Sequence, residues 1–154
     1  MPLSLSSDAF SHGGWIAIAC TCDGSNVSPP LAWSDIPAGT AGLSLVCYDP
    51  DAPRGTFYHW GIYDLAPHMS GLDENAGARA AEPKLCQAMN DFGHAWYDGP
   101  CPPHGHGVHH YHFRLSALRE RLSDVSAKTH CAEILAGARS LEIASAELVG
   151  RYQR

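Results

Sequence analysis

The feature that most constrains the fold is a loop of residues 99–110, dense in proline, glycine and histidine, which runs into a segment of regular alternation. In that segment, residues 111–118, the side chains alternate between an apolar face and a polar face. The apolar face holds Tyr111, Phe113, Leu115 and Ala117, and the polar face holds His112, Arg114 and Ser116. Such alternation is typical of a strand with one buried face, and the prolines and glycines ahead of it restrict the backbone. The sequence therefore predicts a strand with a rigid loop at its start.

Other segments show strand or helix patterns of differing clarity. A density of apolar, aromatic and β-branched residues predicts three further strands. They span residues 15–20, 43–48 and 57–65. A stripe of apolar residues at helical spacing predicts a helix over residues 126–139, with Ser123 or Ser126 as its N-cap. Residues 141–152 fit a helix and a strand, and residues 68–95 have no clear period, so we expect a loop there with at most a helical turn.

Length and charge limit the kind of protein this can be. The chain has 154 residues, enough for one domain with a hydrophobic core and short for two, so we expect residues 1–154 to form a single domain. Its formal net charge of −6 argues against nucleic acid or an anionic membrane surface as the main partner. Protonation of all 10 histidines would add 10 positive charges to −6 and give +4, so the sign can reverse in mild acid.

The first residues and the cysteines bear on the cellular compartment. The chain has no basic start followed by an apolar run, and no apolar stretch is long enough to span a bilayer. We therefore expect a cytoplasmic protein without a membrane span. The six cysteines are scattered through a chain large enough to fold without crosslinks, which predicts free thiols rather than a disulfide framework. They are Cys20, Cys22, Cys47, Cys86, Cys101 and Cys131.

Two segments, residues 48–60 and 99–115, hold most of the reactive side chains. Because Pro50 disfavours helical backbone at Asp49, we expect Asp49 and Asp51 on extended backbone with their side chains on the same side. The two carboxylates have two interpretations. They form a general acid and base pair, or they accept backbone N–H groups in a turn. Either way, these segments predict a small polar pocket.

Histidines are the other candidate ligands of such a pocket. His59, and His109 together with Tyr111, lie where the two segments are expected to converge, and the proline-rich loop offers backbone N–H groups. Five histidines close together, with a nearby cysteine, also raise the possibility of Zn²⁺, Ni²⁺ or Cu²⁺ binding. These are His104, His106, His109, His110, His112 and Cys101. Strand alternation directs His110 and His112 away from His109, so spacing places no three on one ion, and we predict neither a native metal site nor a cofactor.

Several runs along the chain resemble the phosphatidylethanolamine-binding protein family, and within it the bacterial branch known as Raf kinase inhibitor-like. The runs are Cys22-Asp-Gly-Ser-Asn26, Ser28-Pro-Pro-Leu-Ala-Trp33, Asp49-Pro-Asp-Ala-Pro53, His59-Trp60, Asp91-Phe-Gly93, Tyr97-Asp-Gly-Pro-Cys-Pro-Pro-His-Gly105, His109-His-Tyr-His-Phe113 and Ala144-Ser-Ala-Glu-Leu-Val-Gly150. They occur in the family's order and cover the chain from about residue 10 to the end.

The resemblance implies a mainly β fold, an antiparallel β-sandwich with a few short helices and a shallow anion-binding pocket at one end. The residues that match the family's pocket are Asp49, Asp51, His59, Pro102, Pro103, His109 and Tyr111. The resemblance also implies that one of the two aspartates hydrogen-bonds to a pocket histidine and so fixes the orientation of its ring. Family members bind phosphate-like or carboxylate groups, including phospholipid head groups, and modulate kinases or proteases.

Two positions depart from the branch's pattern. Where the branch often has a basic residue after the paired prolines, this chain has His104, and where it often has an arginine before the pocket tyrosine, this chain has His110. Both exchanges replace a permanent positive charge with a titratable one. We therefore expect anion affinity to be greater at about pH 6 than at about pH 8.

Taken together, the sequence predicts a non-enzymatic binding protein for a small anion such as phosphate, phosphoethanolamine or acetate. The resemblance further implies no catalytic residue, a protein partner of the kinase or protease class, and a homodimer. One alternative is a histidine-assisted or metal-dependent hydrolase that uses the same pocket. Another is a pure interaction protein with a vestigial pocket.

Overall fold

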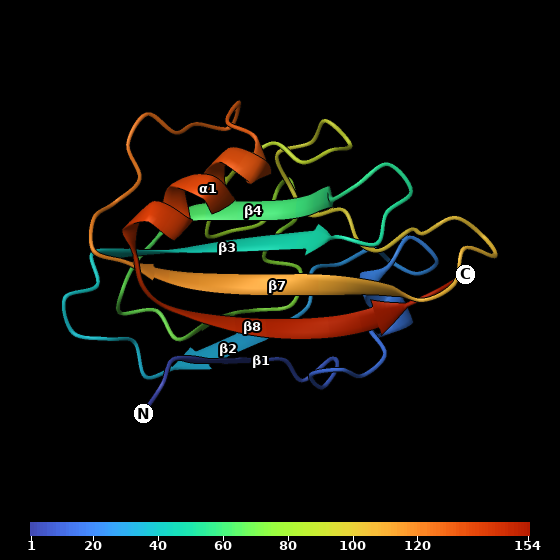
Figure 1. The fold of residues 1–154 in the computed structure, drawn as a ribbon, viewed down its shortest axis with the longest axis horizontal. Coiled ribbons are helices and arrows are strands. Elements are labelled where there is room, and N and C mark those ends of the chain that lie inside the picture. Colours follow the sequence, from blue (N-terminus) through green and yellow to red (C-terminus); the bar gives the residue numbers. More distant parts are fainter.

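A computed structural model describes residues 1–154 and shows two antiparallel sheets packed face to face, with one α-helix on the outer face of the larger sheet (Figure 1). The elements in chain order are β1 (Ser4–Ser6), the 3₁₀ turn η1 (Ile18–Cys20), β2 (Leu31–Ser34), β3 (Gly42–Asp49), β4 (Phe57–Leu65), β5 (Gly71–Leu72), β6 (Cys86–Gln87), β7 (His109–Leu118), α1 (Cys131–Leu141) and β8 (Glu142–Tyr152). The small sheet has the order β1-β2-β5, and the large sheet has the order β6-β4-β3-β7-β8. The predicted β-sandwich is confirmed.

The core lies between the two sheets. Inward side chains of β7 alternate as predicted, with Tyr111, Phe113 and Leu115 at most 1% exposed. They pack with Trp33 of β2 and Trp60 of β4 in one apolar cluster. Burial of such large side chains stabilises the fold by about 1.5 to 3 kcal/mol each before the loss of conformational entropy is counted. The alternation read from the sequence thus fixes which face of β7 meets the smaller sheet.

The outer face of the large sheet is covered over β3 and β4 by α1 (Figure 1). Ile134 and Cys131 of the helix pack against Val46 of β3 in a second, smaller apolar cluster. The predicted N-cap was wrong, because the helix begins at Cys131 rather than near residue 126. His130 is the N-cap instead. Its Nδ1 accepts the N–H of Ala132, and the carboxylate of Glu133 accepts the N–H of His130.

In two other segments the backbone conformation depends on contacts with distant residues, which the sequence pattern does not show. Residues 15–20 were predicted to form a strand, but they contain a single β-bridge at Trp15 and a 3₁₀ turn, with Trp15 and Ile18 49% and 62% exposed. The ambiguous segment at the end is strand β8, because it pairs with β7 along nearly its whole length. Within residues 68–95 the structure has two short strands, β5 and β6. No helix combines the length and the apolar composition that a bilayer crossing requires.

Candidate functional site

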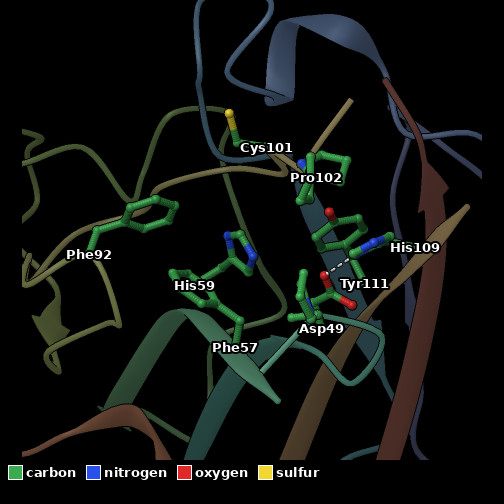
Figure 2. A pocket seen from close by; sticks show the side chains of 11 residues that line it. Asp49, Phe57, His59, Phe92, Cys101, Pro102, His109 and Tyr111 are labelled. Atoms are coloured by element: carbon green, nitrogen blue, oxygen red, sulfur yellow. Dashed lines mark hydrogen bonds and ion pairs between the residues drawn. The ribbon is translucent and has the colours of Figure 1, made fainter. Parts of the chain in front are cut away.

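A cavity of about 210 Å³ opens at one end of the large sheet (Figure 2). Its lining residues are Asp49, Ala52, Pro53, Phe57, His59, Phe92, Cys101, Pro102, Pro103, His109 and Tyr111. Six of the seven residues predicted for the pocket are among them, and Asp51 is not. Neither a lysine nor an arginine lines the cavity.

Strand topology explains why these residues meet. Strand β3 ends at Asp49, whereas β4 begins at Phe57 and β7 begins at His109. Because β4 and β7 both pair antiparallel with β3, the end of β3 and the starts of its two neighbours lie at the same edge of the sheet. Asp49, His59 and His109 are therefore brought together by register alone, although they lie up to 60 residues apart.

Asp49 holds His109 in a fixed orientation. The Nδ1–H of His109 donates to the Asp49 carboxylate at 2.6 Å, and both side chains are at least 96% buried. The other carboxylate oxygen of Asp49 accepts the backbone N–H of Asp51 at 2.8 Å. On the opposite side of the ring, His109 Nε2 lies 2.7 Å from Nδ1 of His106. The expected contact between a carboxylate and a pocket histidine is present, and both nitrogens of His109 have partners within the protein.

The placement of Asp51 differs from the prediction. Pro50 and Asp51 form a turn rather than extended backbone, because the side chain of Asp49 accepts the N–H two residues on and closes that turn. Asp51 points away from the cavity and pairs with His110, accepting both its backbone N–H and its Nδ1–H, at 2.8 and 2.7 Å. The interpretation of the carboxylates as turn acceptors therefore applies to Asp49, whereas Asp51 accepts from His110 in a distant strand. Asp51 ties the turn to the start of β7.

A backbone carbonyl outside the cavity fixes the orientation of the His59 ring. Its Nδ1 lies 2.8 Å from the backbone carbonyl oxygen of Asp98, and only 4% of the residue is exposed. A carbonyl oxygen can only accept, so Nδ1 carries the proton and, in the neutral ring, Nε2 is a bare acceptor. Burial lowers the pKa of His59, against the opposing influence of Asp98, Asp49 and Asp91. The neutral form, with its free lone pair, is thus favoured.

Tyr111 lies beside His59 in the cavity lining. Its ring centroid lies 5.3 Å from that of His59, and the two rings stand at 76° (Figure 2). No hydrogen bond within the protein engages this hydroxyl, and the residue, which is 1% exposed, lines the cavity. Burial, reinforced by the nearby charge of Asp49, raises the pKa of Tyr111 far above its usual value. The phenol therefore keeps its proton and remains a donor.

Two aromatic rings that the sequence analysis did not single out close the third side. Phe57 and Phe92 meet edge to face at 4.8 Å between centroids, and each lies within 5.6 Å of the ring of His59. Phe92 belongs to a tight loop that Asn90 organises by accepting two backbone N–H groups. The signal for Phe92 was its place in the run Asp91-Phe-Gly93, which matches the family pattern. These rings give the cavity an apolar wall.

The proline-rich loop forms the remaining wall and is crosslinked. A disulfide joins Cys101 to Cys22, so the prediction that all six cysteines are free thiols was wrong for this pair. Gly99 lies so close to the loop at residue 20 that an added Cβ would stand 2.0 Å from the carbonyl oxygen of Cys20. Pro102 and Pro103 have no N–H, which limits the backbone donors that we expected from this loop.

The remaining histidines of the cluster lie outside the cavity. His110 pairs with Asp51, and His112 donates to Glu147 at 2.8 Å on the outer face of the sheet. His104 contacts Arg154 through its Nε2. No group of three or more histidine, cysteine or acidic side chains has an arrangement suited to hold a metal ion. The two histidines that replace basic residues of the branch therefore do not line the site.

The chain is similar to known proteins over its whole length. Residues 6–153 match the sequence model of the family described as phosphatidylethanolamine-binding protein. A UPF0098 protein of Methanothermobacter thermautotrophicus is 39% identical over 153 residues, covering 99% of each chain, and one of Aquifex aeolicus is 36% identical over 148 residues, covering 96% of this chain and 86% of its own. The crystal structure of Escherichia coli YbcL, described as a new member of the mammalian PEBP family, superposes with a TM-score of 0.94 at 31% identity and covers 100% of this chain and 99% of its own. The chain therefore belongs to the phosphatidylethanolamine-binding protein family.

Proposed function

We propose that this chain is a non-enzymatic binding protein whose cavity holds one small oxyanion group, such as phosphate, the phosphate group of phosphoethanolamine, or acetate. The observation that carries the proposal is that two buried residues, His59 and Tyr111, line one cavity, and that no hydrogen bond within the protein engages His59 Nε2 or Tyr111 Oη. Buried polar groups are nearly always hydrogen-bonded in folded proteins. An unpaired acceptor and an unpaired donor in one cavity indicate a ligand that satisfies both.

The dimensions of the cavity support a small polar group rather than a large ligand. Its volume of about 210 Å³ lies below the range of roughly 300 to 1,000 Å³ that is typical for drug-sized molecules. Phe57, Phe92 and the paired prolines exclude water from one side, which strengthens hydrogen bonds inside. A head group therefore fits, with the rest of its molecule outside the opening.

Ligand-induced thermal stabilisation tests the proposal. A ligand at 100 times its Kd stabilises the native state by about 2.7 kcal/mol, which raises the Tm of a chain of this size by about 5 to 11 °C. Phosphate, phosphoethanolamine and acetate should each raise the Tm, and the double variant His59→Ala/His109→Ala should lose the increase. The matched control, His94→Ala/His112→Ala, removes two imidazoles outside the cavity and should keep it. An equal response in both double variants would contradict the site.

A hydrolase acting in the same cavity is the second candidate, and the buried pair of Asp49 and His109 is the observation that favours it. A carboxylate that orients an imidazole is a common arrangement for general base catalysis. Turnover of p-nitrophenyl phosphate and p-nitrophenyl acetate by protein purified without nickel resin decides between the two. We expect no turnover above that of Asp49→Asn.

Several expectations from the sequence stay predictions. These are the kinase or protease partner, the homodimer, the single-domain organisation and the cytoplasmic location. Light scattering after size-exclusion chromatography measures the oligomeric state directly. The disulfide removes one argument for the cytoplasm, because disulfides persist mainly in oxidising compartments.

A further inference from the structure

We propose that a second cavity of this protein, the β6 cavity, binds a small organic acid, that is, a carboxylate carried on an apolar group such as an aromatic ring. This cavity has a volume of about 530 Å³ and is lined by both residues of β6, the strand at one edge of the large sheet. No residue lines both the β6 cavity and the cavity that contains His59. Binding in the β6 cavity is therefore independent of the proposed function.

The charge of its wall favours an anion. Arg79 and Lys84 line the β6 cavity, and no acidic side chain does. Each of four other cavities has at least one acidic residue in its lining. Neither Arg79 nor Lys84 forms an ion pair within the protein. Two unneutralised cations thus lie together in a chain whose net charge is −6, and they attract an anion to this place.

Aromatic contacts hold the Arg79 guanidinium at the wall. Its Cζ lies 5.1 Å from the centroid of the Trp96 ring, and the ring of His94 stacks on Trp96 at 4.4 Å between centroids. Nδ1 of His94 lies 2.8 Å from the carboxylate of Asp98. Because a cation is attracted to the face of an indole ring, the guanidinium is partly positioned before a ligand arrives. A planar guanidinium can donate two parallel hydrogen bonds to a carboxylate.

Gln87 adds a buried donor. The residue lines the β6 cavity and is 8% exposed. Its side chain lies 2.7 Å from Nε1 of Trp60, and because an indole N–H can only donate, the atom in contact is the carbonyl oxygen Oε1. No hydrogen bond within the protein engages the other amide atom, Nε2. A buried amide with unused N–H groups indicates a ligand that accepts a hydrogen bond.

The rest of the lining favours an organic acid over an inorganic anion. Tyr63, Leu85 and Trp96 supply apolar surface beside the charged groups. Small-molecule sites are typically mostly apolar, have a few polar groups that fix the orientation of the ligand, and range over roughly 300 to 1,000 Å³. The β6 cavity has this composition and size. A carboxylate on Arg79 and Lys84, with its apolar frame against Trp96, satisfies both parts of the wall.

Cys86 supplies a local measurement of binding. It lines the β6 cavity and is exposed, whereas the other three free cysteines are buried. N-Ethylmaleimide, an uncharged reagent, should therefore alkylate Cys86 first in the folded protein, and mass spectrometry gives the rate. Isophthalate should slow this reaction in a saturable manner, by about tenfold at ten times its Kd. Isophthalamide, its uncharged counterpart, and inorganic phosphate, which has no apolar group, should not slow it.

Variants of the two cations test the wall. Arg79→Gln and Lys84→Gln should each weaken isophthalate binding by about three- to tenfold, because each removes one charge-assisted contact. The matched control Arg54→Gln/Arg119→Gln removes two exposed arginines that line neither cavity, and it should leave protection unchanged. Each rate is expressed relative to the same variant without isophthalate, which corrects for changes in thiol reactivity. Calorimetric titration of Cys86→Ser with isophthalate measures binding without the reagent.

Each outcome has a definite meaning. Protection that requires the carboxylates and both cations supports the β6 cavity as an organic acid site. Equal protection by isophthalamide, or protection that persists in Arg79→Gln/Lys84→Gln, overturns it, as does the absence of protection and of heat with isophthalate. Protection by a peptide of alternating glutamate and phenylalanine at concentrations tenfold below those of isophthalate overturns a free acid as the ligand. Stabilisation by phosphate without protection of Cys86 leaves the proposed function standing in every case.

Discussion

Removal of the disulfide between Cys22 and Cys101 should destabilise the protein strongly, because this bond closes a long loop. The two cysteines are 79 residues apart in sequence. In the chain-entropy account, crosslinking a loop of that length stabilises the folded state by about 4.5 kcal/mol at 25 °C, and measured effects are typically about 2 to 4 kcal/mol. For a chain of this size the full value corresponds to a decrease in Tm of about 9 to 18 °C.

The double variant Cys22→Ser/Cys101→Ser tests this expectation. Serine is close in size to cysteine, and Cys101 is exposed, so the variant changes little besides the crosslink. Urea unfolding followed by tryptophan fluorescence gives the free energy of unfolding for each protein. Cys86→Ser is the control, because Cys86 is an exposed free thiol and its loss should change stability by less than about 0.5 kcal/mol.

A direct count of thiols provides an independent check on the same reasoning. Thiol titration of the denatured wild type without reductant should find the four free cysteines, and six after reduction. A double variant as stable as the wild type, or six thiols before reduction, would refute the argument. Because Cys101 also lines the cavity, the same variant should bind phosphate more weakly.

Three further predictions follow from the site and its supports. Asp49→Asn should lower the free energy of unfolding by about 1.5 to 3 kcal/mol, because it weakens a buried hydrogen bond to a charged group, whereas Asp51→Asn at the surface should change it little in urea unfolding. Gly99→Ala should cost about 1 to 3 kcal/mol, since its Cβ would collide with the backbone at Cys20, whereas Gly137→Ala in α1 should be tolerated. Burial lowers the pKa of His59 in the folded state, so the unfolded chain binds a proton first, and the contribution of His59 to stability is complete above about pH 6.5 and decreases as the pH falls below it. Urea midpoints at pH 5 and pH 7 should therefore differ less in His59→Gln than in the wild type, and an unchanged difference would contradict this assignment.

The strands that carry the site were predictable from local patterns, namely alternation over residues 111–118 and a density of apolar, aromatic and β-branched residues over residues 43–48 and 57–65. The predicted strand at 57–65 coincides with β4, and the strand predicted at 43–48 lies within β3. The apolar run at 15–20 has the same composition, yet its backbone groups bond to the edge of β8 through single contacts such as Ile16 N–H to the carbonyl of Arg151. Composition over six residues does not distinguish a paired strand from such an edge segment.

Contacts between distant loops were not predictable from the sequence. The Cα atoms of Cys22 and Cys101 lie 5.4 Å apart only because the loops at residues 20–26 and 99–107 pack together at the end of the sandwich. Counting cysteines in a chain of this length favours free thiols, and the count has no information on which pair becomes adjacent. Likewise, nothing local to His130 marks it as a helix cap in place of a serine.

The polarity of the cavity depends on contacts of the same kind. Residue types alone predict two imidazoles and a phenol, and a protonated imidazole would make an ordinary anion site. The structure instead aims the proton of His59 at a carbonyl 39 residues away and engages both nitrogens of His109. The tautomer of neutral His59 is thus set by Asp98, whose backbone oxygen contacts the ring from outside the cavity, and a family motif that names only the lining residues does not encode it.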